Sequence, residues 1–411
     1  MNKTNEVFLA VLKGALVGEK VDPGRKVSAE EWGRLFRLAR IHQILPLFYD
    51  AVYPYITEEA AALGAEIRMQ VRVQVIRQAI KTSEFLTLNQ QLRAAGVKPL
   101  VVKGLICRNL YPNPDARASG DEDVLIPADQ FALCHRALRE FGMQTTEVAP
   151  ASAYEVPYRK EGSPLYIELH KHLFPPESTA YGSLNRFFME VHERAVEEEI
   201  QGHRICTMDP TDHLLYLICH AFKHFLHSGF GIRQVCDIVL FANRYGSRVD
   251  WQRILRCCKK IRADKFAAAM FRIGEKYLVF DPEKAAYPEV WRKIAVDEGP
   301  MLEDLLAGGL YGDSSMSRKH SSNMTLAAVT AQKQGKKGVS ATLSAAFPAP
   351  EKLEGRYPWL KKQPYLVPVA WGHRMWKYSR ETMQIRQNSA ADALKIGSER
   401  IALLKQYGIV E

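Results

Sequence analysis

The stretch LVVKGLICRNLYPNPDARASGDEDVLI, residues 100–126, decides how the rest of the chain is organised. Its first apolar run stops at Lys103-Gly104, which is typical of a strand that ends in a tight turn. A short helix is expected over residues 105–110, and a loop containing two prolines follows it. A second apolar run, residues 124–126, closes the unit. The order strand, turn, helix, loop and strand predicts the beginning of a small sheet.

Two acidic side chains of this stretch point to one face. Successive side chains in an extended backbone project to opposite faces, so Asp121 and Asp123 project together and Glu122 projects the other way. Carboxylates held side by side are unfavourable unless a cation lies between them, and divalent ions that bind a triphosphate are the usual solution. The pattern therefore predicts a site for two Mg²⁺ ions, with Mn²⁺ as the alternative metal.

A third carboxylate, Glu168, follows about 45 residues after Asp123. In Tyr166-Ile-Glu-Leu-His170, alternation places Glu168 and His170 on one face. We expect this strand beside that of Asp123, with Glu168 as the third catalytic carboxylate and a ligand of the second ion. His170 either orients Glu168 or is a hydrogen-bonded histidine of the sheet.

The rest of the chain predicts helices around this sheet. Ser28 and Glu31 form a capping box, and a long amphipathic pattern ends at Gly96. A further strand is expected over residues 143–148. The fold class is therefore α+β, a small mixed sheet flanked by N-terminal and C-terminal helical regions. The expected regions are helical residues 1–96, the sheet core 97–178, a helical domain 179–310, a flexible loop or linker 311–350 and a basic helical segment 351–411.

Several motifs together resemble the uncharacterised nucleotidyltransferase family of the DNA polymerase β-like superfamily. They are Lys103-Gly104, Arg117-x-Ser119-Gly120-Asp121-x-Asp123, Ile167-Glu-Leu-His170, His220-x-x-x-His224, Gly231-Ile-Arg233-x-x-x-Asp237 and Asp250-Trp251. The likeness covers residues 90–260 best. It implies a nucleotidyltransferase core in which Asp-x-Asp lies on one strand and a third carboxylate on its neighbour. Lys103-Gly104 stands where the superfamily usually has Gly-Ser.

Residues near the turn are candidates for nucleotide binding. Gly104 would let a phosphate approach the backbone and Lys103 would add positive charge, although a strand end with an extended lysine gives the same pattern. Ser119 and Gly120 would add a hydroxyl and an open backbone beside the metals. Arg117 is expected to bind phosphate or to brace Asp121.

Two more motifs leave alternatives open. Arg233 either pairs with Asp237 one helical turn away or reaches the nucleotide or the acceptor. His220 and His224 have the spacing of some zinc sites, but no Glu follows His220 and no third ligand is evident. We therefore favour packing or hydrogen bonding for the two histidines.

Positive charge is concentrated towards the C-terminus. The chain has 56 Lys+Arg and 46 Asp+Glu, and residues 316–411 hold 16 and 6 of them, so residues 1–315 balance at 40 of each. The basic region would meet a nucleic acid or another anionic partner, or would form a solvated face. Its aromatic residues would stack on bases or pack against the body: Trp359, Tyr365, Trp371 and Trp376.

The remaining sequence features concern the compartment. No apolar run reaches the roughly 20 residues that cross a bilayer, and residues 1–6 lack a signal-peptide pattern. The 7 cysteines form no CxxC pair, which is typical of reduced thiols. These features predict a cytoplasmic protein without a transmembrane segment.

Together these features predict a metal-dependent nucleotidyltransferase. It would move a nucleoside monophosphate from an NTP to a hydroxyl of a small molecule, a protein or an RNA, and release pyrophosphate. The alternative is a binding module that keeps the same fold and holds a nucleotide or a partner without catalysis.

Overall fold

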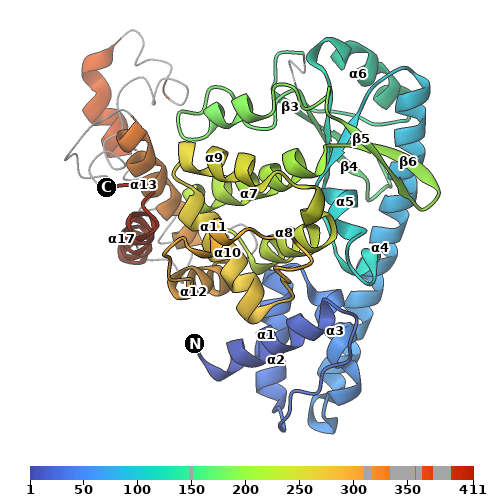
Figure 1. Ribbon diagram of the computed structural model, residues 1–411, viewed down its shortest axis with the longest axis vertical. Helices are drawn as coiled ribbons and strands as arrows, with labels where there is room; N and C mark the ends of the chain where they lie inside the picture. Colours follow the sequence, from blue (N-terminus) through green and yellow to red (C-terminus); the bar gives the residue numbers. More distant parts are fainter. Residues whose placement is uncertain (148–150, 310–315, 334–356, 358–362, 374–389) are drawn as a thin grey trace.

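The computed structural model describes residues 1–147, 151–309, 316–333, 357, 363–373 and 390–411. A small sheet lies at one side of the molecule, and helices surround it (Figure 1). The long helix α4 runs along the outer edge, while the C-terminal helices α13 and α17 lie on the opposite side (Figure 1). The α+β class expected from the sequence is confirmed.

The central sheet has four strands in the order β1-β2-β4-β3. β2 and β4 run parallel, and the outer pairs β1–β2 and β3–β4 are antiparallel, so the sheet is mixed as expected. In this register Asp123 lies opposite Val102 on one side and Glu168 on the other. The strands are β1 (Leu100–Val102), β2 (Glu122–Leu125), β3 (Glu155–Arg159) and β4 (Tyr166–His170).

The N-terminal region is helical, as the sequence predicts. The Ser28 hydroxyl accepts a hydrogen bond from the Glu31 backbone N–H at 3.3 Å, and Gly96 has φ of 85° just past α4. The expected cap at one helix start and glycine at another helix end are therefore both present. The helices are α1 (Lys3–Ala15), α2 (Ala29–Ile41), α3 (Leu45–Val52) and α4 (Ala61–Ala94).

The strand expected over residues 143–148 is wrong for the described part, 143–147. Only Gln144 forms a bridge there, exchanging backbone hydrogen bonds of 2.7 and 2.8 Å with Arg159. Residues 144–147 are exposed or half-buried, so no apolar face holds them to the sheet. The two helices of this core region are α5 (Gly104–Arg108) and α6 (Phe131–Glu140).

A β-hairpin interrupts the region that was expected to be helical. Its turn, Gln201-Gly202, has positive φ at both positions, as tight two-residue hairpin turns require. The Thr207 hydroxyl donates to the Val101 carbonyl at 2.6 Å, which fastens the hairpin to β1. The hairpin strands are β5 (Val196–Ile200) and β6 (His203–Thr207). The helices that follow are α7 (Pro210–His227), α8 (Ile232–Tyr245), α9 (Trp251–Lys260), α10 (Asp264–Tyr277), α11 (Glu289–Arg292) and α12 (Gly299–Gly308).

Part of the expected linker is instead a helix, α13 (Met316–Lys333), which packs beside α17 (Ala390–Gln406). Arg318 and Arg400 are both buried and pair with the two oxygens of Asp304 at 2.6 and 2.7 Å. Buried ion pairs with Asp304 therefore help to hold α13 and α17 in place. This explains why the sequence of α13 lacks a clear apolar pattern.

Other expectations for the C-terminal region fall partly outside the described residues, among them Trp359, Trp376 and linker residues 334–350. Tyr365 is exposed, whereas Trp371 packs against a small buried cluster. In the described part of the chain, no helix combines the length and the apolar character needed to cross a membrane.

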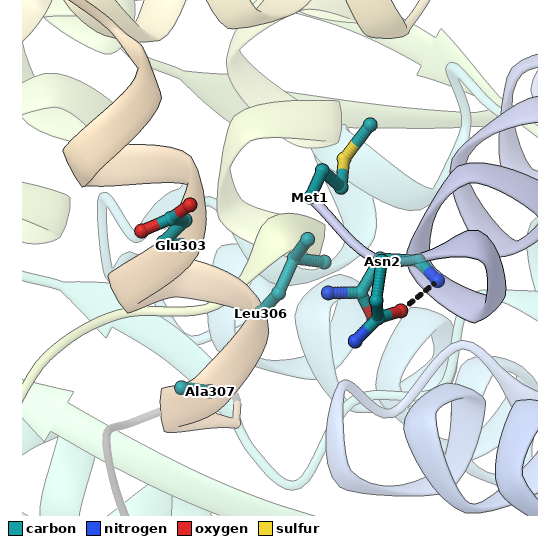
Figure 2. Close-up of a pocket in the computed structure, with 6 residues that line it drawn as sticks. Met1, Asn2, Glu303, Leu306 and Ala307 are labelled. Atoms are coloured by element: carbon teal, nitrogen blue, oxygen red, sulfur yellow. Dashed lines mark hydrogen bonds between the residues drawn. The ribbon is translucent and has the colours of Figure 1, made fainter.

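A hollow of about 570 Å³ lies between the chain start and α12 (Figure 2). Its lining includes Asn2, Asn5 and Glu303, and no residue of the central sheet. It contains none of the carboxylates that the sequence singles out, so the candidate site lies elsewhere.

Candidate active site

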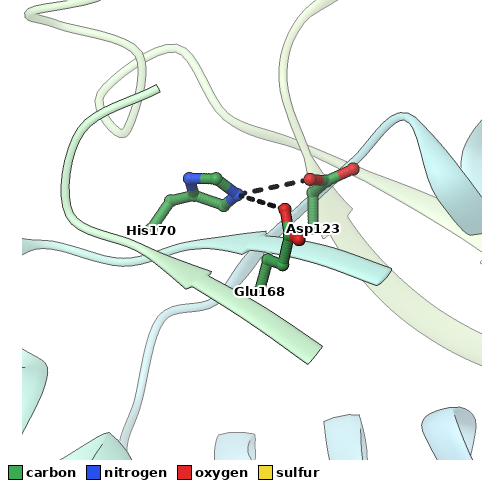
Figure 3. Close-up of side chains that lie close together, drawn as sticks. All are labelled: Asp123, Glu168 and His170. Carbon is green, nitrogen blue, oxygen red and sulfur yellow. Dashed lines mark hydrogen bonds and ion pairs between the residues drawn. The ribbon is translucent and has the colours of Figure 1, made fainter. Parts of the chain in front are cut away.

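Three side chains converge on one face of β2 and β4 (Figure 3). Asp123 and Glu168 are register partners on parallel strands, and His170 lies two residues further along β4, so all three share a face. His170 Nε2 lies 3.2 Å from Asp123 Oδ1 and 3.8 Å from Glu168 Oε2. One potential ligand atom from each lies within 4.8 Å of the others. Among the described residues, these three form the one such group that could hold a metal ion.

The charges of this group are unbalanced in the protein alone. Burial, and after it the negative charges of Asp121 and Asp123, raise the pKa of Glu168 to about 7. Burial would also raise the pKa of Asp123, but Lys103 and His170 outweigh that effect and hold it below its ordinary value. His170 acts on Glu168 in the opposite direction from 3.8 Å but does not offset burial and the neighbouring carboxylates, which fits a site built for a divalent ion.

Asp121 immediately precedes β2 and lies outside the converging group of three. It is half-buried, and its charge acts on Glu168 as the first of the neighbouring carboxylates. Asp123 and Glu168 therefore lie close together, and Asp121 lies near enough for its charge to act on Glu168 without belonging to the group.

Lys103 occupies the turn between β1 and α5 with φ of 58° and ψ of −97°, in the left-handed region that favours glycine. Its backbone N–H donates to His213 Nε2 at 3.0 Å. Its ammonium lies 2.8 Å from Asp123 Oδ2. The turn therefore aims a positive charge at the carboxylate group, and the backbone conformation carries a cost of about 1–3 kcal/mol.

Substitutions at Lys103 should separate this backbone cost from the charge. Lys103→Gly and Lys103→Ala both remove the ammonium, but only glycine relaxes the positive φ. We expect the glycine variant to be more stable than the alanine variant by about 1 kcal/mol, measured as the free energy of unfolding in urea. Equal stability, or a more stable alanine variant, would show that the turn is not strained.

Helix α7 adds basic and neutral groups that face the carboxylates. His220 Nε2 lies 3.5 Å from Lys103 Nζ and 3.3 Å from His224 Nε2. Burial, followed by nearby positive charges, holds the pKa of both histidines well below the ordinary value, so both are neutral at pH 7. The hydrogen-bonding role expected for this pair agrees with the contact between them.

Lys223 on the same helix was missed by the sequence analysis. Its pKa is lowered first by burial, while the charges of Glu155, Asp123 and Glu168 act in the opposite direction. It therefore lies within electrostatic reach of the carboxylate group. Its position between His220 and His224 was the available signal, but helical spacing alone places it on a neighbouring face.

The opposite face of β2 carries a buried charge network. Glu122 is fully buried and accepts from Arg108 Nη1 at 2.6 Å, with Lys81 Nζ of α4 at 3.3 Å. Ser119 joins it, because its hydroxyl accepts from Arg108 Nη1 at 2.8 Å and from Lys81 Nζ at 3.0 Å. A Cβ at Gly104 would overlap the Glu122 carboxylate, so glycine is required there by packing. The structure thus places Gly104 and Ser119 against this network, behind the converging side chains.

Arg117 is buried against α8. Its Nε donates to Asp237 Oδ1 at 2.9 Å and its Nη2 to Oδ2 at 2.5 Å, and the Tyr111 hydroxyl donates to the same carboxylate at 2.8 Å. The carboxylate that Arg117 braces is therefore Asp237 and not Asp121. Long sequence separation hid this pairing.

Arg233 also supports the loop that leads to β2. Its Nη1 donates to Gln43 Oε1 at 2.9 Å and to the Ala118 carbonyl at 2.5 Å. Gly120 lies in the same loop, and a Cβ there would meet no atom within 4 Å. Arg233 of α8 therefore holds the start of this loop, and the backbone at Gly120 is not covered by neighbouring atoms.

Comparison with known proteins assigns the chain to a family. Residues 28–278 match the family model described as "Uncharacterised nucleotidyltransferase", and the chain belongs to that family. A search of curated protein sequences found no match.

One solved structure resembles the chain weakly. It is an antigenic nucleotidyltransferase-like protein from Paracoccidioides brasiliensis, with 14% identity and a TM-score of 0.31. The match covers 50% of this chain and 95% of that chain.

Proposed function

We propose that the protein is a metal-dependent nucleotidyltransferase that moves a nucleoside monophosphate from an NTP to a hydroxyl acceptor. Family membership supports nucleotidyl transfer in general. The observation that carries the specific proposal is the pairing of Asp123 with Glu168 across parallel strands, with their side chains converging on one face. The pKa of Glu168, raised by burial and by the neighbouring carboxylates, supports a role for an added cation.

In this proposal Asp121, Asp123 and Glu168 hold the divalent ions. The donor set of carboxylate oxygens beside a histidine suits Mg²⁺ or Mn²⁺. The bound metal would offset charge on the phosphates and lower the pKa of the acceptor hydroxyl. Asp121 lies outside the converging group and would approach the ions from the loop before β2.

Positive side chains on the other side of the site would hold the triphosphate. Lys103 already contacts Asp123 Oδ2, and Lys223 lies within reach of the same group, so a triphosphate bound there would meet both ammonium groups. The open backbone at Gly120 would allow close approach. We assign Arg117, Arg233 and Ser119 to holding the loop because they bind Asp237, the Ala118 carbonyl and Arg108, and Gly104 to packing of the turn against Glu122.

The proposed reaction forms one bond and breaks one. The acceptor oxygen bonds to the α-phosphorus of the NTP, and the bond from that phosphorus to the β-phosphate oxygen breaks. Pyrophosphate leaves with the bonding electron pair, and the acceptor hydroxyl releases its proton. Electrostatic stabilisation of the charge at phosphorus is the main contribution expected of the site.

The test is a labelling assay with each of the four NTPs, carrying labelled α-phosphate, in the presence of Mg²⁺ or Mn²⁺ and cell extract as the source of acceptors. We expect label to enter an acceptor and pyrophosphate to be released. The Asp121→Ala, Asp123→Ala double variant should lose both signals. Turnover that persists in the double variant, or tight nucleotide binding without pyrophosphate release, would contradict the proposal, and the second result would support the non-catalytic binding module.

A further inference from the structure

His170 has the position of a metal ligand. Its imidazole is buried, and Nε2 lies 3.2 Å from Asp123 Oδ1 and 3.8 Å from Glu168 Oε2. Ligand atoms that each lie about 2.1 Å from one cation are roughly 3.0–3.4 Å from each other in octahedral and tetrahedral sites. The distances from His170 to the two carboxylates are therefore close to the spacing that one shared ion requires, and all three ligand atoms lie within 4.8 Å of one another (Figure 3).

The sheet register explains why nitrogen joins the two oxygens. Glu168 and His170 are separated by one residue on β4, so they share a face, and Asp123 on β2 is the register partner of Glu168. Asp123 uses Oδ2 for Lys103, at 2.8 Å, and turns Oδ1 towards His170. Oδ1 of Asp123 therefore faces His170 while Oδ2 stays paired with Lys103.

A third carboxylate lies behind the histidine ring. Glu155 on β3 is the antiparallel register partner of His170, and its Oε2 lies 3.6 Å from His170 Nδ1, an ion-pair distance that is longer than a hydrogen bond. A carboxylate hydrogen-bonded to the distal ring nitrogen is the usual arrangement around metal-binding histidines, and a bound ion would replace the proton that Nε2 donates to Asp123 Oδ1 in the metal-free protein. A short approach of Glu155 to Nδ1 would therefore position His170 for the ion.

We propose that His170 is a direct metal ligand, positioned by Glu155, and that it makes the site bind Mn²⁺ in preference to Mg²⁺. Mg²⁺ is a hard cation that prefers oxygen ligands and strict octahedral geometry, whereas first-row transition ions accept imidazole nitrogen readily. A site with one nitrogen and two carboxylates therefore favours the transition ion. The inference deepens the proposed function by naming the metal, and it rests on the same carboxylates.

The experiment measures metal binding without any nucleotide. Mn²⁺ binding to the full-length protein is followed by the loss of the free-ion electron paramagnetic resonance signal, and Mg²⁺ binding by competition. We expect Mn²⁺ to bind at least about tenfold more tightly than Mg²⁺, and pulsed measurements to show coupling of bound Mn²⁺ to a histidine nitrogen.

Three variants test the assignment. His170→Ala should weaken Mn²⁺ binding by about tenfold or more, abolish the nitrogen coupling and leave Mg²⁺ affinity within about twofold. Glu155→Gln should weaken Mn²⁺ binding less than His170→Ala does and should retain the coupling. His172→Ala is the matched control, because this exposed histidine lies two residues further along the chain, and it should bind both ions as the unmodified protein does.

Two results would overturn the inference: bound Mn²⁺ without nitrogen coupling in the unmodified protein, or unchanged metal preference in His170→Ala. If His170→Ala does not fold, judged by circular dichroism, His170→Gln gives the same readout with a polar side chain retained. Nitrogen coupling without NTP turnover would leave this inference standing and contradict the proposed function. Turnover with Mg²⁺ and no nitrogen coupling would do the reverse.

Discussion

The variant Glu168→Gln should lose nucleotidyl transfer by about 100-fold or more and, at the same time, become more stable than the unmodified protein at pH 8 without metal. The loss of activity follows from removing a metal-binding oxygen charge at the centre of the site. The gain in stability follows from removing a carboxylate whose pKa is raised first by burial and then by the charges of Asp121, Asp123 and Glu155. A purely structural residue would change both quantities in the same direction.

The sign of the pH effect follows from the pKa of Glu168, which is about 7 in the folded protein against an ordinary value of 4.5. The folded state therefore binds this proton more tightly than the unfolded state does. Its favourable contribution is complete below about pH 4.5 and is lost as pH rises to about 7. Because the side chain is 23% exposed, solvent reduces the effect, and we expect the neutral glutamine to stabilise the protein by on the order of 2 kcal/mol at pH 8.

Urea unfolding in the presence of a chelator, at pH 5 and pH 8, measures this effect. The gain for Glu168→Gln should be present at pH 8 and small at pH 5, and added Mn²⁺ should stabilise only the unmodified protein. Glu161→Gln is the matched control, since this exposed glutamate lies in the turn before β4 and should change neither stability nor transfer. A Glu168→Gln variant that is inactive and also less stable at pH 8 would assign the residue to the fold alone.

The second large effect is expected at Glu122. Glu122→Ala should lower the free energy of unfolding by about 3–5 kcal/mol, because it leaves Arg108 and Lys81 buried without their carboxylate. Lys81 and Glu122 are 3% and 0% exposed, so water cannot replace the lost partner in the folded state. The network also joins α4 and α5 to the loop before β2 through Ser119, so its loss should displace Asp121 as well.

Urea unfolding at pH 7 measures this prediction. Glu122→Gln keeps the shape of the side chain and one acceptor oxygen, and it should cost less than alanine while remaining destabilising. Glu140→Ala, at an exposed position near the end of α6, should stay within about 0.5 kcal/mol of the unmodified protein. A cost below about 1 kcal/mol for Glu122→Ala would show that the two buried cations find other partners.

Several elements of the site could be predicted because they depend on local periodicity. A period of two places Asp121 and Asp123 on one face of an extended segment and Glu122 on the other. In the structure Asp123 pairs with Lys103 at the candidate site, whereas Glu122 pairs with Arg108 in the buried network on the opposite face. The pairing of the Glu168 strand with the Asp123 strand was also expected and is confirmed. The hairpin β5–β6 could have been found from Gln201-Gly202, but its strands lack a clear alternation.

The amino-acid sequence by itself determined the α+β class, the position of the strand–turn–helix–strand unit and the face on which its carboxylates lie, since these follow from neighbouring residues. Only the tertiary structure decided that Arg117 pairs with Asp237, 120 residues away, and that Lys81 of α4 reaches Glu122. It also decided that Glu155 lies behind His170, through the register of β3 on β4. The physical reason is that a buried charge must find a partner in three dimensions, and the choice among distant partners is made by packing, which leaves no periodic trace along the chain.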